Sequence, residues 1–218
     1  MKTYSGDDED EATMHSKAPT IQWVFWLSLA CLLGCNDKPA RIKPPAIDAK
    51  ASAKQAIELF DADSSGSIDK SELAASPGLE AVLDKVDTDA NGELSEDELQ
   101  TKFQSMADSA SGVLPATITV VKNGRPLQGV RVVLDPEPFF GDVIVPAEGE
   151  TDLYGMAALR SPAVRGGMQL GIYRIRITKS ENNKETIPAK YNAETTLGIE
   201  ISSSSPAITS TRGYVIEI

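Results

Sequence analysis

The sequence predicts a multidomain α + all-β protein, in which a small helical region precedes an antiparallel β-sandwich and an N-terminal leader precedes both. Three observations support this prediction. An uncharged, largely apolar stretch lies within residues 18–36, a twelve-residue acidic pattern occurs twice between residues 61 and 98, and segments rich in β-branched residues follow residue 113. At 218 residues, the chain can hold one domain or two small ones.

The composition describes an acidic chain that can fold. Thirty-two acidic and 21 basic residues give a net charge of −11, while 41% of the residues are hydrophobic and 24% are charged. A polyanion gains no counterion-release free energy on nucleic acid, so nucleic-acid binding is excluded as a function class. Beyond Cys35 there is no cysteine and no histidine. This excludes Cys–His and Ser–His–Asp catalysis, and zinc sites of Cys or His, from residues 36–218.

The first residues are expected to form a leader. Residues 1–34 contain an apolar run of about 14 residues, which is too short for a permanent membrane helix but suits a signal peptide. The run ends at Leu32-Leu33-Gly34-Cys35, which resembles the bacterial lipobox. The resemblance implies a cleaved lipoprotein signal peptide and lipidation of Cys35. It also implies a membrane anchor in the bacterial cell envelope, facing the periplasm or the cell surface; the alternative is an uncleaved anchor.

The residues around this leader add three expectations. Five acidic residues at 7–11 precede the apolar run, although such a region is normally basic, and this favours Met14 as the true start. After the lipidated cysteine, three prolines predict an extended tether over residues 35–47. The residue after Cys35 is Asn36 and not an aspartate. By resemblance to lipoprotein sorting in enterobacteria, this favours the outer membrane over the inner one.

A twelve-residue pattern repeats 26 residues apart, in residues 61–72 and 87–98. Oxygen-bearing side chains alternate along each copy, with a glycine at the sixth position and a glutamate at the twelfth. A hard dication needs six to eight oxygens at roughly 2.3–2.6 Å, and this alternation supplies them. Gly66 and Gly92 are expected to permit a sharp turn that a Cβ would obstruct. Both copies resemble the EF-hand calcium loop at every position with a chemical role.

The resemblance implies two Ca²⁺ sites, one in each copy. In the first copy, the expected ligands at positions one, three, five, seven, nine and twelve are Asp61, Asp63, Ser65, Ser67, Asp69 and Glu72. In the second copy they are Asp87, Asp89, Asn91, Glu93 and Glu98, with Ser95 at position nine. Position seven acts through its backbone carbonyl, position nine often through a water molecule, and the bidentate glutamate favours calcium over magnesium.

Apolar residues at helical spacing flank both loops and predict an EF-hand pair over residues 48–110. They are Ala53, Ala56, Ile57 and Phe60 before the first loop, Leu79, Val82, Leu83 and Val86 before the second, and Leu99, Phe103 and Met106 after it. Ser76-Pro77-Gly78 is expected to break the connection between the loops into two very short helices. The apolar eighth residues, Ile68 and Leu94, are expected to meet in a two-stranded ladder.

The charge distribution favours a structural role for the metal. Residues 48–109 carry fifteen acidic and five basic residues, whereas residues 116–218 carry eleven of each. The crowded carboxylates repel one another, so bound calcium would relieve the strain. Met106 is the only methionine in the first of these ranges, so the Met-rich groove of calmodulin-like sensors is missing. Sites in extracytoplasmic modules bind calcium at about 10⁻⁴–10⁻³ M, which is the affinity expected here.

Residues 113–218 are expected to form the β-sandwich. Segments at 117–121, 130–134, 172–177 and 213–218 are β-branched or alternate with period two, which indicates strands. Asn123-Gly124 between the first two segments indicates a hairpin turn. Several short strands joined by turns over about 100 residues favour an antiparallel sandwich.

This part of the chain also resembles a known family. Residues 123–130, 151–155, 171–175 and 188–192 are similar to the carboxypeptidase-regulatory-like (transthyretin-like) domains found in small bacterial lipoproteins. The resemblance implies a β-sandwich fold. An insert around Phe139-Phe140-Gly141 departs from the family pattern, and the zinc ligands of the peptidase itself have no counterpart.

No acid–base constellation is visible in the predicted sandwich. Asp152 and Lys190 are the polar residues to examine, and they are interpreted as a turn aspartate and a solvated lysine. The predicted function is that of a non-enzymatic, calcium-binding, membrane-anchored envelope lipoprotein, whose two EF-hand sites stabilise a surface or periplasmic module. The alternative is an accessory binding module that recognises a cell-envelope glycan or protein partner, with calcium setting the domain geometry. An enzyme is the third hypothesis.

Overall fold

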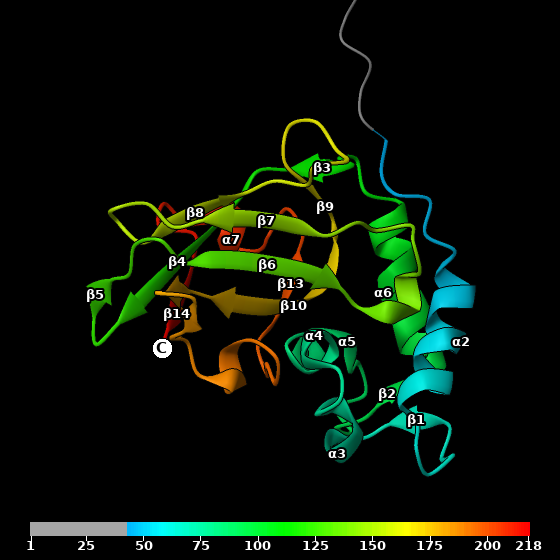
Figure 1. Ribbon diagram of the computed structural model, residues 1–218. Coiled ribbons are helices and arrows are strands. Elements are labelled where there is room, and N and C mark those ends of the chain that lie inside the picture. Colours follow the sequence, from blue (N-terminus) through cyan, green and yellow to red (C-terminus); the bar gives the residue numbers. More distant parts are fainter. Residues whose placement is uncertain (1–42) are drawn as a thin grey trace, which may run out of the picture. The chain divides into compact units, whose positions relative to one another are not determined.

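The computed structural model of the chain describes residues 43–218, called the folded unit below (Figure 1). The expected signal peptide at 1–34, the start at Met14 and the lipidated Cys35 lie outside the described residues. Within residues 43–218, no helix is both long enough and apolar enough to cross a membrane.

The last residues of the expected tether pack against the folded unit. Residues 43–47 are irregular, but Pro45 and Ile47 are buried. Gly112 lies against the same segment, because a Cβ added to it would lie 1.9 Å from the carbonyl oxygen of Lys43. The apolar Ile47 side chain also joins the hydrophobic core of the folded unit. Residues 43–47 are therefore part of this unit.

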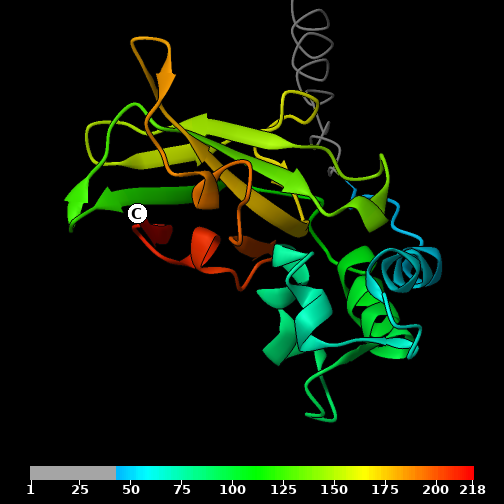
Figure 2. The same ribbon diagram turned by 60° about the horizontal axis from the view of Figure 1, so that its bottom comes forward.

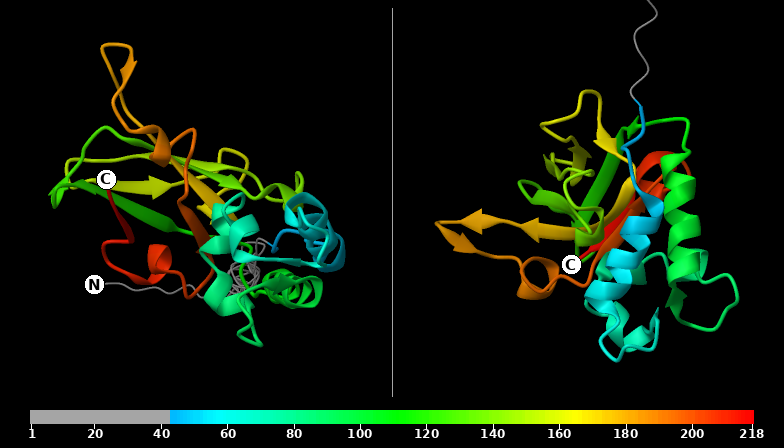
Figure 3. Two further views of the ribbon diagram at one scale, coloured as in Figure 1. Left: turned by 90° about the horizontal axis from the view of Figure 1, so that it is seen from below. Right: turned by 90° about the vertical axis from the view of Figure 1, so that its right-hand side faces the viewer.

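Two helices of 12 residues each, α2 (Ala49–Phe60) and α6 (Glu96–Ala107), pack against each other (Figure 3). Asp48 caps α2, since its Oδ1 accepts a hydrogen bond from the backbone N of Ala51 at 3.0 Å. The residues predicted to face inward are buried at Ala53, Ala56, Leu99, Phe103 and Met106. Helical periodicity therefore identified the packed faces correctly.

Short elements connect these two helices. The one-turn helices α3 (Lys70–Leu73), α4 (Pro77–Glu80) and α5 (Leu83–Val86) lie between the two long ones. Proline stands at the first position of α4, where its missing N–H has no intrahelical partner to lose, and the expected break is confirmed. Three short helices form instead of the expected two, because Val82 leaves the helical conformation and separates α4 from α5. Strands β1 (Ser67–Ile68) and β2 (Leu94–Ser95) form an antiparallel ladder. In it Ile68 lies opposite Leu94, as expected, and both side chains are fully buried.

One antiparallel sheet of the strand-rich region has the order β13–β10–β6–β7. Its strands are β6 (Arg131–Pro136), β7 (Ala147–Glu150), β10 (Gly171–Thr178) and β13 (Gly198–Ile201). From Tyr173 to Thr178 of β10, buried Tyr173, Ile175 and Ile177 alternate with less buried residues, which is the period-two pattern of a strand with one face in the core.

The second sheet is built around β4 (Ala116–Lys122), which pairs with β5 (Arg125–Pro126), β8 (Met156–Leu159) and β14 (Tyr214–Glu217). The β5 and β8 pairings are antiparallel, but β14 runs parallel to β4. This pairing differs from the expected antiparallel arrangement. The chain reaches β14 from β13 of the other sheet through α7 (Pro206–Thr209), so no hairpin with β4 sets its direction.

The two sheets are joined where β7 and β8 meet. Glu148 and Arg160 exchange backbone hydrogen bonds of 2.9 Å across this edge. Smaller ladders pair β3 (Val113–Leu114) with β9 (Met168–Gln169), and β11 (Ser180–Glu181) with β12 (Lys184–Glu185). The antiparallel pairings agree with the strand-rich region that the sequence predicts, and packing as a sandwich stays a prediction.

The turns of this region explain the residues that the sequence singled out. Asn123 and Gly124 both have positive φ, at 51° and 69°, as the expected two-residue hairpin turn requires. The Oδ1 of Asp152 accepts hydrogen bonds from the backbone N of Tyr154 (2.8 Å) and Met156 (2.9 Å), so it organises a turn. Lys190, the middle residue of the 3₁₀ turn η3 (Ala189–Tyr191), is exposed and places its Nζ 4.7 Å from the ring centroid of Tyr191.

The helices and the sheets share one buried core. Figure 2 shows the helices at one end of the sheets, and buried residues of both parts form a single hydrophobic cluster. The insert at Phe139-Phe140-Gly141 forms the 3₁₀ turn η2 (Pro138–Phe140), which contacts α2. The insert therefore lies at the junction between the helical and the strand-rich parts.

Glu200 of β13 makes polar contacts across the same junction. Its almost completely buried carboxylate accepts hydrogen bonds from the Nζ of Lys102 in α6 (2.7 Å) and of Lys85 in α5 (3.2 Å). Burial alone would raise the pKa of this carboxyl, but the hydrogen bond and charge of Lys102, together with Lys85, lower the pKa below its usual value. The ion pairs therefore favour the ionised form of Glu200.

We expect Glu200→Gln to lower the free energy of unfolding at pH 7 by about 2 kcal/mol, because two charge-assisted hydrogen bonds are weakened. Since the folded-state pKa lies below the ordinary glutamate value of 4.5, this contribution is present above pH 4.5 and disappears as the pH falls through the folded-state pKa. Urea unfolding in EDTA at several pH values measures the difference from wild type. Glu194→Gln, at an exposed position, is the control, and a difference that does not shrink in acid would contradict this account.

Candidate metal centre

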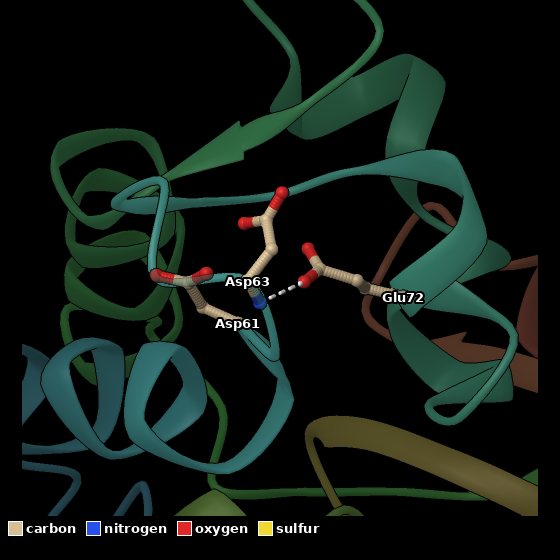
Figure 4. A group of neighbouring side chains, drawn as sticks. All are labelled: Asp61, Asp63 and Glu72. Atoms are coloured by element: carbon tan, nitrogen blue, oxygen red, sulfur yellow. Dashed lines mark hydrogen bonds between the residues drawn. The ribbon is translucent and has the colours of Figure 1, made fainter.

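Each acidic loop brings three carboxylates together. In the first loop, oxygens of Asp61, Asp63 and Glu72 lie within 4.8 Å of one another, and Figure 4 shows Glu72 reaching toward the loop segment that carries Asp61 and Asp63. The second loop gathers the equivalent residues, Asp87, Asp89 and Glu98, within the same limit. The first aspartate of each set directly follows a helix, α2 or α5, and the glutamate lies in the helix that follows the loop.

A capping box sets the position of each glutamate. The Oε2 of Glu72 accepts a hydrogen bond from the backbone N of Asp69 (2.9 Å), while Oδ1 of Asp69 accepts one from the backbone N of Glu72 (3.0 Å). In the second loop, Oε2 of Glu98 accepts from the backbone N of Ser95 (3.0 Å), whose Oγ caps α6 in return. The ninth and twelfth loop residues thus also start the next helix. The Asp-x-x-Glu and Ser-x-x-Glu spacing is the sequence signal that would have revealed this role.

The other glutamate oxygen reaches the beginning of the loop. The Oε1 of Glu72 accepts hydrogen bonds from the backbone N of Ala62 (2.6 Å) and Asp63 (3.2 Å). The Oε1 of Glu98 accepts from the backbone N of Thr88 (2.7 Å) and from its hydroxyl (3.0 Å), a contact that sequence reasoning missed. Each glutamate therefore joins the end of its loop to the start.

Backbone N–H groups of the loop hold the aspartates inward. In the first loop, Asp61 accepts from the backbone N of Ser65 (3.0 Å) and Gly66 (2.9 Å), and Asp63 also accepts from Ser65 (3.0 Å). The second loop repeats this pattern, with Asp87 and Asp89 accepting from the backbone N of Asn91 (3.2 and 3.1 Å), and Asp87 also accepting from that of Gly92 (2.8 Å). The same local bonds thus orient both carboxylate sets.

The other expected ligands take part in bonds within and between the loops. The hydroxyl of Ser65 donates to the carbonyl oxygen of Ser67 (3.1 Å), which is the atom expected to bind metal at position seven. The Ser67 hydroxyl donates to the carboxylate of Glu93 in the other loop. Asn91 Oδ1 accepts from the backbone N of Glu93 (2.8 Å), and the Asp69 carboxylate caps α3. These bonds link the other expected ligands to the loop backbone and link one loop to the other.

The glycines at position six have the backbone conformation that the expected sharp turn requires. Gly66 and Gly92 have φ of 93° and 85°, in the left-handed region where a Cβ would crowd the residue's own backbone. A Cβ added to either would meet no more distant atom within 4 Å, so the local turn and not contact with other segments requires glycine. Ser64 and Ala90, at position four, also have positive φ, at 62° and 59°. Each loop therefore holds a strained non-glycine residue in addition to its glycine.

The local hydrogen bonds favour ionised carboxylates. Burial would raise the pKa of Glu98, but hydrogen bonds from Ser95 and Thr88 outweigh it and lower the pKa to about 2. The hydroxyl of Ser71, followed by the backbone N of Glu72, lowers the pKa of Asp69. Both groups are therefore anionic at neutral pH.

The donor set fits a hard cation. The three converged side chains of each loop offer carboxylate oxygen and neither nitrogen nor sulfur. Calcium and magnesium prefer such oxygen ligands, and calcium takes the larger number of them. The residues that would hold such a cation are Asp61, Asp63 and Glu72 in the first loop and their counterparts in the second.

Comparison with known proteins supports the same assignment. A family model described as "EF hand" matches residues 53–75 and 79–104, which together include both loops and most of their flanking helices. No curated protein and no solved structure matches the chain significantly. The chain thus contains a small helical EF-hand region, followed by a strand-rich region with antiparallel sheets, and the EF-hand match indicates calcium binding.

We expect Gly92→Ala to destabilise the protein by about 1 kcal/mol in EDTA, because alanine is unfavourable at positive φ. Gly92→Asn should cost less, since asparagine tolerates the left-handed region and the space around the Cβ is open. Thermal unfolding of both variants measures the difference. An asparagine variant as unstable as the alanine variant would show that the side chain meets a steric obstacle.

Proposed function

We propose that the protein is a non-enzymatic, calcium-binding lipoprotein of the bacterial cell envelope, anchored to the membrane through Cys35. Its two EF-hand sites stabilise the folded module that the helices and sheets form. The observation that carries this proposal is the convergence of three carboxylates in each of two EF-hand loops.

Charge supports a stabilising role for the ion. Fifteen acidic residues and five basic ones occupy residues 48–109, so the EF-hand region repels itself in the absence of a cation. Two calcium ions would add four positive charges among the converged carboxylates. At free calcium one to ten times the dissociation constant, binding to the folded state alone contributes about 0.4–1.4 kcal/mol per site.

The proposed anchor rests on the sequence before the folded unit. An apolar run leads to Leu32-Leu33-Gly34-Cys35, the pattern that resembles a lipobox. Cleavage before Cys35 would expose its amino group and thiol to lipidation, and residues 36–42 would link the anchor to the unit. The outer membrane is the proposed location, because Asn36 follows the cysteine.

The alternative function is an accessory module that binds a cell-envelope protein or glycan, with calcium setting the geometry of the module. Leu153 and Tyr154 favour it, because they are 63% and 65% exposed at the turn between β7 and β8. Asp152 hydrogen bonds hold this turn in one conformation, so an apolar tip is presented rigidly. Capture of envelope material that is independent of calcium and lost in Tyr154→Ser would support this alternative.

Calorimetric titration of the full chain with CaCl₂ tests the calcium proposal. We expect two ions per chain, with Glu72→Gln and Glu98→Gln each weakening one site, because each removes one charged oxygen ligand. The double variant should show no calcium-dependent rise in melting temperature. Glu194→Gln, at an exposed position outside the loops, should behave as wild type. Fewer than one ion bound at millimolar calcium would refute the proposal.

Metabolic labelling with palmitate tests the anchor. The wild-type chain expressed in a bacterial host should incorporate the label and fractionate with membranes, whereas Cys35→Ala should do neither. Cys31→Ala is the matched control and should retain both properties. Label that persists in Cys35→Ala would place the modification at another residue.

A further inference from the structure

The apolar side of the EF-hand region is covered by a segment of the same chain, residues 137–140. This segment follows β6, contains η2 and lies beside α2 (Figure 1). Phe139 and Phe140 are only 1% and 3% exposed. Both rings are therefore removed from water, at the junction between the helices and the sheets.

The aromatic contacts join the first and last helices of the EF-hand region. Phe103 of α6 stacks on Phe139, with ring centroids 5.1 Å apart and planes at 18°, and it also lies 5.1 Å from the ring of Phe140. Phe60, the last residue of α2, meets Phe139 edge-on at 6.4 Å. Such stacked and T-shaped geometries are favourable for aromatic pairs. Since Asp61 directly follows Phe60, the aromatic cluster lies next to the first metal loop in the chain.

Glu137 extends the contact to the helix between the loops. Its fully buried carboxylate accepts hydrogen bonds from the backbone N of Gly78 in α4 (2.9 Å) and from the guanidinium of Arg174 in β10 (2.8 Å). A Cβ added to Gly78 would lie 2.7 Å from Cγ and Oε1 of Glu137, so this close approach requires glycine. Together with the Glu200 ion pairs to α5 and α6, contacts from the strand-rich region reach α2, α4, α5 and α6.

We propose that segment 137–140 acts as a ligand of the EF-hand region within the same chain. The packing of this segment against the helices, called its seating below, and calcium binding at the loops strengthen each other. This inference rests on the proposed function, because it requires that the loops bind calcium. In EF-hand sensors, calcium opens an apolar groove between helices, and exposure of apolar surface to water is unfavourable. Here Phe139 and Phe140 cover the apolar surface between the helices and the sheets, so calcium binding would not expose it.

The direction of the coupling follows from two features that occur together. While segment 137–140 is seated, the carboxylates of both loops converge within 4.8 Å. Release of the segment would free Phe60 and Phe103 from their ring contacts, and the helices of these residues lead into the first loop and out of the second. The seated arrangement is therefore the one with assembled ligands. Linkage then requires that calcium stabilises the seating by the same factor by which seating raises calcium affinity.

Calorimetric titration of the full chain with CaCl₂ measures one side of this coupling. We expect Phe139→Ala to lower calcium affinity about tenfold, within the range of about 5- to 150-fold that is usual for coupled sites. Phe139→Leu, which keeps part of the apolar contact, should have a smaller effect. Both variants should still bind two ions, since no loop ligand is changed. Val215→Ala, at a 43% exposed apolar position outside the segment, is the matched control.

Hydrogen exchange of the wild-type chain measures the reverse effect, that of calcium on the seating of segment 137–140. This experiment needs no variant. The backbone N of Glu137 donates to the carbonyl oxygen of Ile172 (3.0 Å), and that of Phe140 donates to the carbonyl oxygen of Glu137 (3.2 Å). Saturating calcium should slow exchange at these two amides by a factor similar to the affinity change. Amides of the exposed β11–β12 hairpin should not respond. If Phe139→Ala does not fold, Phe139→Leu and the exchange experiment decide.

Three results would overturn the coupling. Wild-type affinity in the Phe139 variants, with exchange that ignores calcium, would remove it while leaving two-ion binding intact. A higher affinity in these variants would show that the segment opposes calcium binding. Failure of the wild-type chain to bind calcium would refute both this inference and the proposed function.

Discussion

Repulsion between converged carboxylates is the constraint on which this structure depends. Each loop gathers three acidic groups within 4.8 Å, and the loop's own backbone and hydroxyl donors hold them there. Glu98 illustrates the balance, since hydrogen bonds from Ser95 and Thr88 lower its pKa to about 2 despite its burial. Local hydrogen bonding thus keeps Glu98 ionised and holds each set of carboxylates close together. Their mutual repulsion must be offset by packing of the rest of the molecule or by a bound cation.

The strand-rich region supplies much of that packing. The EF-hand region has buried leucines of its own, but Phe60 and Phe103 complete their contacts on Phe139, which belongs to η2. Buried Glu137 and Glu200 add charged or polar contacts to the helices that flank the loops. A small helical pair with few apolar residues is only marginally stable by itself. Its integration with the sheets gives the loops a rigid support and places their chemistry at one end of a larger unit.

Patterns within a few residues of each other predicted the helical region well. The inward faces of α2 and α6, the break at Pro77 and the pairing of Ile68 with Leu94 follow from helical spacing and from loop position. Local reasoning was incomplete where one residue has two roles. Glu72 and Glu98 were expected only as metal ligands, yet they also complete capping boxes. The turn at Gly66 was expected from the loop pattern and is confirmed by its φ of 93°, whereas the open space around this glycine could not be read from the sequence.

The sequence by itself determined the two oxygen-lined loops, the helices beside them and the hairpin turn at Asn123, because each depends on residues close together in the chain. Tertiary structure alone decided three other features. The insert at Phe139 covers the EF-hand helices, β14 runs parallel to β4, and Glu200 pairs with Lys102. The partners in the contacts to Gly78 and Lys102 are 59 and 98 residues apart. Amphipathic patterns show which side of a helix is buried, but they carry no information about which distant segment buries it.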